Sequence, residues 1–323
     1  MRDAGRLQRI AALAAEWAAP FGAQDWPLLQ RDISVGERRP GWSVNGNSRM
    51  VKAADGWMAV TLAREEDRAG VAAWLEGDAG EAPWAAVERL MPRRDCAMLI
   101  ERATWMGLPV ARLGEVAAGG EAVAVLHRRG GVAREGSSLR VVDMSALWAG
   151  PLCAGLLGEW GAEVVRVESL SRPDPTPQTS PLLDARINGG KRRLALDLTR
   201  EDGRAALAEL VAGADVLVTS ARARGLAGLG LRPDEVFAAN PALIWVAVTG
   251  HGWASDRVGF GDDAAVAGGL VSDGPDFLGD ALADPLTGVL AARTALAMLE
   301  AGEAGLVDAA LARCAAHVAE LVA

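Results

Sequence analysis

A carboxylate at the predicted start of a helix is the first candidate for chemistry in this sequence. The run Asp284-Pro285-Leu286-Thr287-Gly288 opens an apolar helical pattern over Val289–Glu300. An Asp at the N-cap with Pro at the first helical position is a strong helix start, and that structural role alone explains both residues. A carboxylate held at a helix N-terminus is also favoured in its ionised form, which suits a nucleophile. Both interpretations are open on residue types alone.

A basic loop is the second candidate. Lys191, Arg192 and Arg193 follow Asn188-Gly189-Gly190 and precede the strand-like run Leu194–Leu198. Phosphate groups need such a concentration of positive charge, and it is informative in a chain of net charge -9. A solvated loop would explain the same three cations, so the pattern is consistent with a phosphate site and with a plain surface loop.

The turn that follows the first predicted strand of the C-terminal half is the third candidate. In Leu147-Trp148-Ala149-Gly150-Pro151, the glycine lets a ligand approach the backbone, and the free amides of the helix that follows favour an anion. Arg222 and Arg224 lie just past another predicted strand and could join Lys191–Arg193 at one phosphate site. A plain strand-to-helix turn also fits, because the Gly-x-Gly-x-x-Gly pattern of dinucleotide sites is absent there.

Further acidic and histidine side chains are weaker candidates. Asp262-Asp263 could transfer protons or bind magnesium, but the spacing places no third ligand, and helix capping is the favoured interpretation. His251, at the end of a predicted strand, could act as an acid or base, although a surface or hydrogen-bonded role is favoured. No metal site is expected.

The elements that must position these residues alternate between strands and helices. Apolar, β-branched strands separated by helical segments predict a parallel, doubly wound sheet with both faces covered. Ligands of such sheets bind at the carboxyl ends of the strands, where the loops above lie. The predicted strands are Leu139–Met144, Glu163–Val167, Val216–Thr219 and Leu243–Thr249, and the helices between them are Leu152–Trp160, Asp202–Ala212 and Pro233–Ala239.

The N-terminal part has a different style and predicts a small α+β domain. Gly, Ser and charged residues without apolar periodicity fill Arg128–Ser138, which we interpret as a linker between domains 1–130 and 139–323. The predicted elements before it are helices Ala4–Ala18, Glu66–Glu76, Pro83–Met91 and Cys96–Met106, and a strand Trp57–Leu62.

Composition limits the class of protein. The chain has 323 residues, 50% of them hydrophobic and 23% charged, which is typical of a globular protein large enough for a substantial core. Its acidic balance argues against a nucleic-acid or anionic membrane partner, and no run of residues is apolar and long enough for a membrane span. Three widely spaced cysteines indicate neither a disulfide framework nor a zinc site, so we expect a cytoplasmic protein.

Five ordered motifs carry a family resemblance. The run 139–168 (L-R-V-V-D-M-S-A-L-W-A-G-P-L-C-A-G-L-L-G-E-W-G-A-E-V-V-R-V-E) resembles the opening of the class III CoA-transferase family, also called CaiB/BaiF. Gly190–Leu198, Ala214–Val218, Asn240–Gly252 and Asp284–Gly288 follow in the family's order. The resemblance implies a Rossmann-like CoA-binding domain that covers nearly everything from Leu139 onward.

The resemblance also implies a nucleophile and a set of CoA contacts. The family's nucleophile is an aspartate four residues before a glycine at a helix start, which Asp284 and Gly288 match and Asp280 does not. Coenzyme A would act as substrate and carrier. The residues implied as its contacts are Trp148, Ala149, Gly150, Lys191, Arg192, Arg193, Leu196, Ser220, Ala221, Arg222 and Arg224, with Arg172 and Arg200 as further basic neighbours.

The order of the two domains is unusual for this family. Ala54–Val60 and Leu99–Glu115 resemble the family's small domain, which ordinarily follows the half that bears the nucleophile. The resemblance therefore implies a circularly permuted chain, and permutation is compatible with one fold when the original termini lie close together. The family also implies a homodimer.

Three functions follow as hypotheses. The leading one is a transferase that moves CoA between an acyl-CoA thioester and a carboxylic acid, with Asp284 as the covalent carrier. The second is an acyl-CoA racemase or isomerase, which needs a partner base such as His251 or Asp262, because Phe260 stands where the family's racemases carry a histidine. The third is a non-catalytic subunit that binds acyl-CoA.

Overall fold

A seven-stranded sheet forms the centre of the molecule. The computed structural model describes residues 2–32, 39–131 and 138–323. Neighbouring strands of the sheet run in the order β4-β12-β9-β8-β5-β6-β7, and all pairs are parallel except β4 with β12. The strands are β4 (Ala124–Arg129), β5 (Arg140–Met144), β6 (Glu163–Ser169), β7 (Arg192–Leu196), β8 (Val216–Thr219), β9 (Ile244–Thr249) and β12 (Ala304–Ala310).

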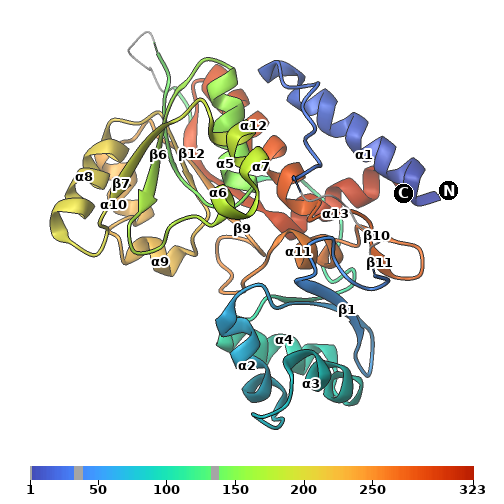
Figure 1. Ribbon diagram of the computed structural model, residues 1–323. Helices are drawn as coiled ribbons and strands as arrows, with labels where there is room; N and C mark the ends of the chain where they lie inside the picture. Colours follow the sequence, from blue (N-terminus) through green and yellow to red (C-terminus); the bar gives the residue numbers. More distant parts are fainter. Residues whose placement is uncertain (1, 33–38, 132–137) are drawn as a thin grey trace.

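Alternating side chains explain why both faces of this sheet are covered. Val216 and Val218 of β8 join one apolar cluster, and Leu217 between them joins another on the opposite face. The first cluster contains helices α5, α7, α12 and α13, and the second contains α8 and α10 (Figure 1). These helices are α5 (Ala149–Glu159), α7 (Pro181–Asn188), α8 (Glu201–Ala212), α10 (Pro233–Ala239), α12 (Ala283–Glu300) and α13 (Leu311–Leu321). The prediction of a doubly wound α/β fold is confirmed.

A small three-stranded antiparallel sheet, in the order β1-β2-β3, forms a second unit below the large sheet (Figure 1). One face packs against its own helices around the buried Trp74, and the other face packs against α11 (Gly261–Ala267) through Met50, Ala59 and Val266. Its elements are β1 (Ser48–Lys52), β2 (Trp57–Thr61), α2 (Glu65–Leu75), α3 (Pro83–Leu90), α4 (Cys96–Met106) and β3 (Val110–Arg112).

The packing divides the chain differently from the predicted domains 1–130 and 139–323. Helix α1 (Arg2–Ala18) packs through Ile10 and Ala14 in the cluster of the large sheet, and strand β4 pairs with β12. The small unit therefore comprises the elements from β1 to β3, and both ends of the predicted first domain belong to the large unit. Most of the predicted linker lies outside the described residues.

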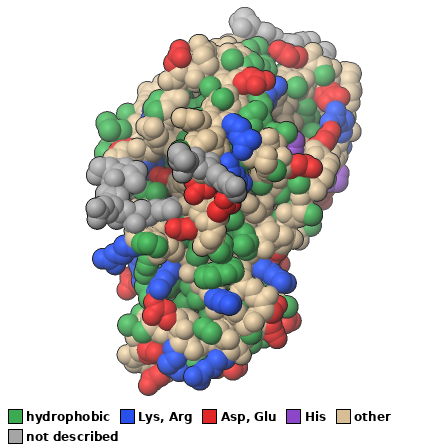
Figure 2. Space-filling model, turned by 90° about the vertical axis from the view of Figure 1, so that its right-hand side faces the viewer, with side chains coloured by type: hydrophobic (Ala, Val, Ile, Leu, Met, Phe, Trp, Pro, Cys, Tyr) green, Lys and Arg blue, Asp and Glu red, His purple; other side chains and the backbone are tan. Residues whose placement is uncertain are grey.

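The remaining short elements connect these units. They are the helical turns η1 (Ala19–Phe21) and η2 (Met91–Arg93), the short helices α6 (Thr176–Thr179), α9 (Ala223–Ala227) and α11 (Gly261–Ala267), and the strands β10 (Val271–Ser272) and β11 (Asp276–Phe277). Figure 2 shows one face of the molecule, with a broad upper lobe and a narrower lower lobe on which positive and negative side chains are interspersed. That face therefore offers no wide basic footprint for a polyanion.

Candidate active site

The strand order creates a crevice at one edge of the large sheet. Read along the chain, β5 is the first strand of the parallel set and β8 the fourth, and they are neighbours, so the direction of winding reverses between them. Loops diverge at such a point and leave room for a ligand. The Ala146 amide, after β5, donates to Ser220 Oγ, after β8, at 2.9 Å. This contact joins the two loops at the base of the crevice.

A cavity of about 380 Å³ opens there. Seven of the residues predicted for the site line it: Ala149, Gly150, Ser220, Ala221, Arg222, Arg224 and Asp284. Arg64 of the small unit and the aromatic side chains of Trp253 and Phe260 complete part of the lining. The cavity thus combines an apolar wall, several arginines and one carboxylate.

Asp284 lies in the first turn of α12 rather than at its N-cap. The helix runs from Ala283, and its N-cap residue is Leu282. The capping interpretation of Asp284 is therefore wrong. Its side chain points instead towards Gly261, where a Cβ atom would approach Asp284 Oδ2 to 2.4 Å. Glycine at position 261 leaves the space that this carboxylate occupies.

Gly288 brings the helix that carries Asp284 close to the cavity. A Cβ atom at Gly288 would lie 2.6 Å from the Ala149 carbonyl oxygen of α5, closer than non-bonded atoms allow. Because Gly288 is one helical turn beyond Asp284, its close approach to α5 sets Asp284 beside Ala149 and Gly150. This packing gives a physical reason for the spacing between the aspartate and the glycine.

Burial makes the Asp284 carboxyl a weak acid by the standard of aspartates. Loss of solvent raises the pKa of Asp284 to about 7, and the charges of Asp262 and Asp280 act in the same direction, while Arg31 and the Gly261 amide oppose them. Arg31 binds Asp280 through two hydrogen bonds, at 2.5 and 2.7 Å. Asp280 is therefore engaged by a cation, whereas Asp284 lines the cavity, which favours Asp284 as the reactive carboxylate.

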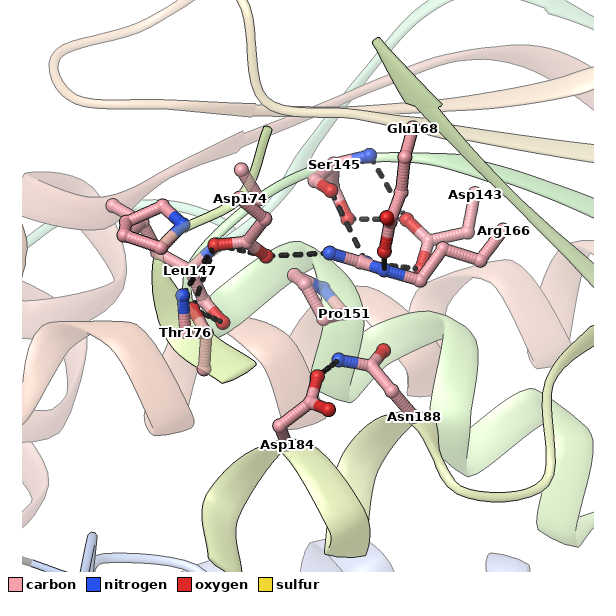
Figure 3. A network of polar contacts seen from close by, with 12 residues as sticks. Asp143, Ser145, Leu147, Pro151, Arg166, Glu168, Asp174, Thr176, Asp184 and Asn188 are labelled. Atoms are coloured by element: carbon pink, nitrogen blue, oxygen red, sulfur yellow. Dashed lines mark hydrogen bonds and ion pairs between the residues drawn. The ribbon is translucent and has the colours of Figure 1, made fainter. Parts of the chain in front are cut away.

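A buried ionic network supports the loop that follows β5 (Figure 3). Arg166 binds Asp143 at 3.2 Å and Asp174 at 2.5 Å, and it also donates to the Ser145 carbonyl oxygen. Asp174 in turn accepts the Leu147 amide at 3.2 Å. These bonds hold Leu147 with a φ of 67°, a left-handed conformation that costs energy in a leucine and persists where surrounding contacts enforce it.

Lys191 belongs to this network and not to a phosphate site. Its ammonium is buried and donates to Asp143 Oδ2 at 2.8 Å, to the Pro151 carbonyl oxygen at 2.7 Å and to Asn188 at 2.8 Å. Although burial would raise the pKa of Asp143, Lys191 and Arg166 hold it below its usual value. The interpretation of Lys191 as a phosphate ligand is therefore wrong, because all three of its donors are occupied.

The neighbouring predicted contacts also lie away from the lining of the cavity as the described residues define it. Arg192 is exposed at the start of β7, and Arg193 binds Glu168 and Asp184. Leu196 packs against the apolar cluster of α8. Trp148 is buried beneath Arg31, whose guanidinium lies 5.1 Å from the ring centroid.

A different group of arginines gathers at the cavity. Arg172, Arg222 and Arg224 line it together with Arg64. Burial lowers the pKa of Arg222, and the positive charges of Arg224, Arg64 and Arg172 lower it further, so the guanidinium groups are close enough to repel one another. Such a concentration of positive charge favours an anion with several phosphates. Arg200, also considered a basic neighbour, instead binds Asp202 on an exposed face.

Sequence reasoning missed the contribution of the small unit. Arg64 lies before α2, and its guanidinium stacks 5.7 Å from the Phe260 ring while it binds Asp67. Arg257 reaches the same cavity but is neutralised by Glu115 at 2.6 Å. No local pattern marks these arginines, because their approach depends on how the two units pack.

Asp262 and Asp263 are buried, His251 is half-buried, and none of the three belongs to the described lining of the cavity. Asp262 and Asp263 lie in the first turn of α11, and neither carboxyl contributes to the described cavity lining. Asp263 caps α11 by accepting the Phe260 amide, so the capping interpretation is confirmed for Asp263.

Burial lowers the pKa of His251 to about 3, so that its imidazole is neutral. Within the described ranges, no group of three or more His, Cys, Asp or Glu side chains has the geometry of a metal site.

The comparison with protein families agrees with this geometry. The model of CoA-transferase family III matches residues 137–322, more than half of the chain, and the chain belongs to this family. The match covers the large sheet from β5 onward, with Asp284 and the loops that line the cavity.

Curated relatives match over part of their length. The chain is 31% identical over 190 residues to a succinyl-CoA–D-citramalate CoA-transferase of Chloroflexus aurantiacus, covering 53% of this chain and 47% of the relative. It is 35% identical over 144 residues to the beta subunit of a succinyl-CoA–L-malate CoA-transferase of the same organism, covering 42% of this chain and 36% of the relative. It is 40% identical over 114 residues to a mouse alpha-methylacyl-CoA racemase, covering 35% of this chain and 28% of the relative. The chain thus spans about half, or less, of these relatives.

A crystal structure of a hypothetical protein of Mycobacterium tuberculosis is similar in fold. The TM-score is 0.53 at 28% identity, and the match covers 59% of this chain and 58% of that chain. In the part of the chain that the structure describes, no helix is long and apolar enough to cross a membrane.

Proposed function

We propose that the protein is a CoA transferase that moves CoA between an acyl-CoA thioester and a carboxylic acid, with Asp284 as the covalent carrier. The observation that carries this proposal is the position of Asp284, a half-buried carboxylate in the first turn of a helix, in the wall of a cavity lined by arginines. Its relatives named as succinyl-CoA transferases support the same reaction. Succinyl-CoA is therefore the first donor to test.

The chemistry balances without another reactant. An Asp284 oxygen attacks the thioester carbonyl, the C–S bond breaks, and CoA leaves as its thiolate, which gives a mixed anhydride. The thiolate then attacks the aspartyl carbonyl and releases the donor acid, leaving CoA on Asp284. The acceptor carboxylate attacks this aspartyl thioester, and the thiolate, released again, attacks the acceptor carbonyl. The products are the acceptor thioester and a free Asp284 carboxylate.

The arginines at the cavity would bind the phosphates of CoA. Arg222 and Arg224 of the predicted contact set, with the predicted neighbour Arg172, supply charge at the carboxyl edge of the sheet, whereas Lys191 does not reach the cavity lining. Ala149, Gly150, Ser220 and Ala221 would approach the pantetheine chain, because their small side chains leave room for it. The amide of Gly150 is the proposed donor to the oxyanion that forms during attack.

The racemase hypothesis is less well supported. A racemase needs a second acid or base opposite Asp284, but the imidazole of His251 and the carboxyl of Asp262 are both absent from the described lining of the cavity. Phe260 lines the cavity at the position where the family's racemases carry a histidine. Exchange of the α-proton of an acyl-CoA for deuterium, without transfer to an acid, would support racemisation instead.

Transfer itself tests the proposed function. The protein is incubated with succinyl-CoA and a panel of carboxylic acids, and chromatography with mass spectrometry follows new thioesters. We expect at least one acceptor thioester with release of an equal amount of succinate, and none with the Asp284→Asn variant. Equal turnover by the variant would contradict the role of Asp284.

We further propose that the chain is a circular permutation of the family's usual order. The end of α13 lies beside α1, since Arg9 donates to the Val322 carbonyl oxygen at 2.7 Å. Strands β4 and β5, which lie on either side of the predicted linker, belong to the same sheet, with β12, β9 and β8 between them. A rearranged chain that begins at Leu139 and joins Ala323 to Met1 through a short linker is expected to fold and bind CoA as the original does.

The proposed location is the cytoplasm, which three free cysteines support.

A further inference from the structure

Four buried side chains form a continuous chain of oxygens between the small unit and the start of α12. Ser48 of β1 and Thr61 of β2 are cross-strand partners, and their hydroxyl oxygens lie 2.9 Å apart. Ser48 Oγ also lies 2.9 Å from Asp262 Oδ2, and Thr61 Oγ1 lies 2.9 Å from Asp263 Oδ1. All four residues are buried.

The number of hydrogens does not match the number of contacts if both carboxyls are ionised. Each hydroxyl carries one hydrogen, and an ionised carboxylate carries none. Only two hydrogens would then be available for three oxygen–oxygen contacts. In one contact the two oxygens would face each other without a hydrogen between them, and this contact would be repulsive in a buried site. A proton on either carboxyl supplies the third hydrogen, and every contact becomes a hydrogen bond.

The surroundings indicate which carboxyl holds the proton. Asp263 Oδ2 is buried and has no hydrogen-bond partner among the described residues, so an ionised Asp263 would leave a charged oxygen unsatisfied. Asp263 Oδ1 accepts the Phe260 amide at 3.0 Å, which leaves Oδ2 without a donor. Both oxygens of Asp262, in contrast, have a partner, because Oδ2 contacts Ser48 and Oδ1 accepts the Ala281 amide at 3.0 Å, and Arg31 attracts its charge. The neutral form therefore suits Asp263 and the ionised form suits Asp262.

Charged and titratable groups from several elements face this chain. Asp262 faces Arg31, Asp280 and Asp284, and Asp263 faces Asp262 and Arg64. His251 approaches Asp263, because a Cβ on Gly259 would lie 3.4 Å from both Asp263 Oδ2 and His251 Nε2. Burial raises the pKa of Asp263 to about 7 and also raises the pKa of Asp262, in agreement with one protonated carboxyl.

We propose that Asp262, Ser48, Thr61 and Asp263 share one proton, which rests on Asp263 and can pass through the two hydroxyls to Asp262. In that transfer the O–H bond of Asp263 breaks and its hydrogen moves to Thr61 Oγ1, the original Thr61 hydrogen moves to Ser48 Oγ, and the original Ser48 hydrogen moves to Asp262 Oδ2. No proton is gained or lost. The negative charge moves from Asp262 to Asp263, and so away from Asp284.

The same chain positions Asp284. Asp262 holds the Ala281 amide, Ala281 has a left-handed φ of 46°, and the Ala281 carbonyl oxygen accepts the Asp284 amide at 2.9 Å. Ser48 and Thr61 are therefore positioning residues that link the small unit to the turn before Asp284. This part of the inference rests on the proposed function of Asp284.

Infrared spectroscopy tests the shared proton without any measurement of activity. At about pH 6, ordinary carboxyls are ionised, so a protonated-acid carbonyl band must come from a carboxyl of raised pKa. Asp284, whose pKa burial raises to about 7, is expected to contribute one such band in the wild type, and the Asp284→Asn variant should remove it. We expect a second acid band to remain in that variant and to disappear when Asp263→Asn is added.

Replacements of Thr61 supply a matched pair. Thr61→Ser keeps the hydroxyl and is expected to leave the band of Asp263 unchanged. Thr61→Val removes the acceptor of the acid O–H, so the carbonyl band should move to higher frequency, which loss of packing alone would not cause. The absence of a second acid band, or a band that survives Asp263→Asn and is lost with Asp262→Asn, would overturn the proposal.

Adduct formation tests the link to Asp284 separately. Asp262→Asn removes a negative charge beside Asp284 and is expected to shift the pH midpoint of adduct formation to lower pH, whereas Asp263→Asn should leave the midpoint in place. An equal midpoint in both variants would contradict the link. If the wild type forms no adduct, the proposed function fails, and the infrared bands still decide whether the proton is shared.

Discussion

At the residue scale, the reactivity of Asp284 depends on the balance between burial and nearby charge. Burial raises the pKa of Asp284, and Arg31 opposes this effect while it is itself bound to Asp280. A carboxylate with few strong donors is a better nucleophile than one held in a tight ion pair, because less of its charge is already neutralised. The site thus keeps Asp284 available to attack while Asp280 engages the cation.

The pH dependence of adduct formation follows from this raised pKa. Only the ionised Asp284 attacks a thioester, and its pKa is about 7. The rate is therefore expected to rise about tenfold per pH unit below neutrality and to level off above it. Rapid quenching with mass spectrometry across this pH range measures the profile, and a rate that is flat down to about pH 5 would show that Asp284 ionises as an ordinary aspartate.

The arginines of the cavity give a second prediction at this scale. Arg222→Ala removes a charge-assisted contact to phosphate and is expected to raise the Kd of CoA about tenfold or more, with little effect on a pantetheine thioester that lacks the phosphates. Arg192→Ala is the matched control, because Arg192 is exposed outside the described cavity lining. Isothermal titration calorimetry measures both. An equal loss of CoA affinity in the two variants would contradict this prediction and would indicate that the phosphates bind beside β7.

At the element scale, the contact of α12 with α5 determines where Asp284 lies. Gly288 faces the Ala149 carbonyl oxygen, and Gly150 faces Ser145, where an added Cβ would approach the Ser145 Cβ to 2.3 Å. Gly288 thus permits the close approach of α12 to α5, and Gly150 leaves room for Ser145 in the turn that precedes α5. The two helices carry the proposed nucleophile and the proposed oxyanion donor, so their close packing fixes the distance between those groups.

Substitution of Gly288 tests this packing. Gly288→Ala is expected to destabilise the protein by about 1–3 kcal/mol and to slow adduct formation, because the added methyl group forces α12 away from α5. Gly5→Ala is the control: apart from its chain neighbours and the nearby backbone of α1, no atom lies within 4 Å of its Cβ position, and alanine favours a helix by about 1 kcal/mol. Chemical denaturation measures both changes. A Gly288→Ala protein as stable as wild type would contradict the tight contact.

Hydrophobic periodicity predicted the strands and helices whose own sequence pattern is clear. It missed strands whose pairing partners lie far away in the sequence. The sequence predicted β8 over Val216–Thr219, α4 over Cys96–Met106 and α10 over Pro233–Ala239 with the observed bounds. It missed β4 and β12, which pair antiparallel with each other although they lie far apart in the sequence. Tertiary pairing, and not local propensity, determines those strands.

The residues of the candidate site also fall into two groups, those that the sequence could predict and those that it could not. The motif around Asp284 and the small residues after β5 and β8 could be predicted, because each follows a recognisable strand or opens a helix. Lys191 could not be interpreted correctly, since its partner Asp143 is 48 residues away and an ammonium in a glycine-rich loop is typical of phosphate sites too. Arg64 had no signal, because only packing of the small unit brings it to the cavity.

At the scale of the whole molecule, the cavity is built by both units. Arg64 comes from the small unit, and Asp284 with most of the lining comes from the large one. The buried hydroxyls of Ser48 and Thr61 join the units behind Asp284. A change in the packing of the small unit would therefore alter both the size of the cavity and the charge around its carboxylate.

Self-association is a prediction at this scale. The family resemblance implies a homodimer, and Trp105, 76% exposed on α4, leaves a large apolar side chain uncovered in the single chain. Size-exclusion chromatography with light scattering is expected to give twice the mass of one chain. Trp105→Ser would weaken the dimer if that side chain lies in the interface, and a clean monomer for the wild type would refute the expectation.

Intact-protein mass spectrometry tests the central claim most directly. Wild type and Asp284→Ala proteins are incubated with several acyl-CoAs, and part of each sample is then treated with hydroxylamine, which cleaves anhydrides and thioesters. We predict an adduct of acyl or CoA mass on the wild type that hydroxylamine removes and that the variant does not form. A hydroxylamine-sensitive adduct of equal amount on Asp284→Ala would contradict the account, as would the absence of any adduct from a wild-type protein that binds CoA.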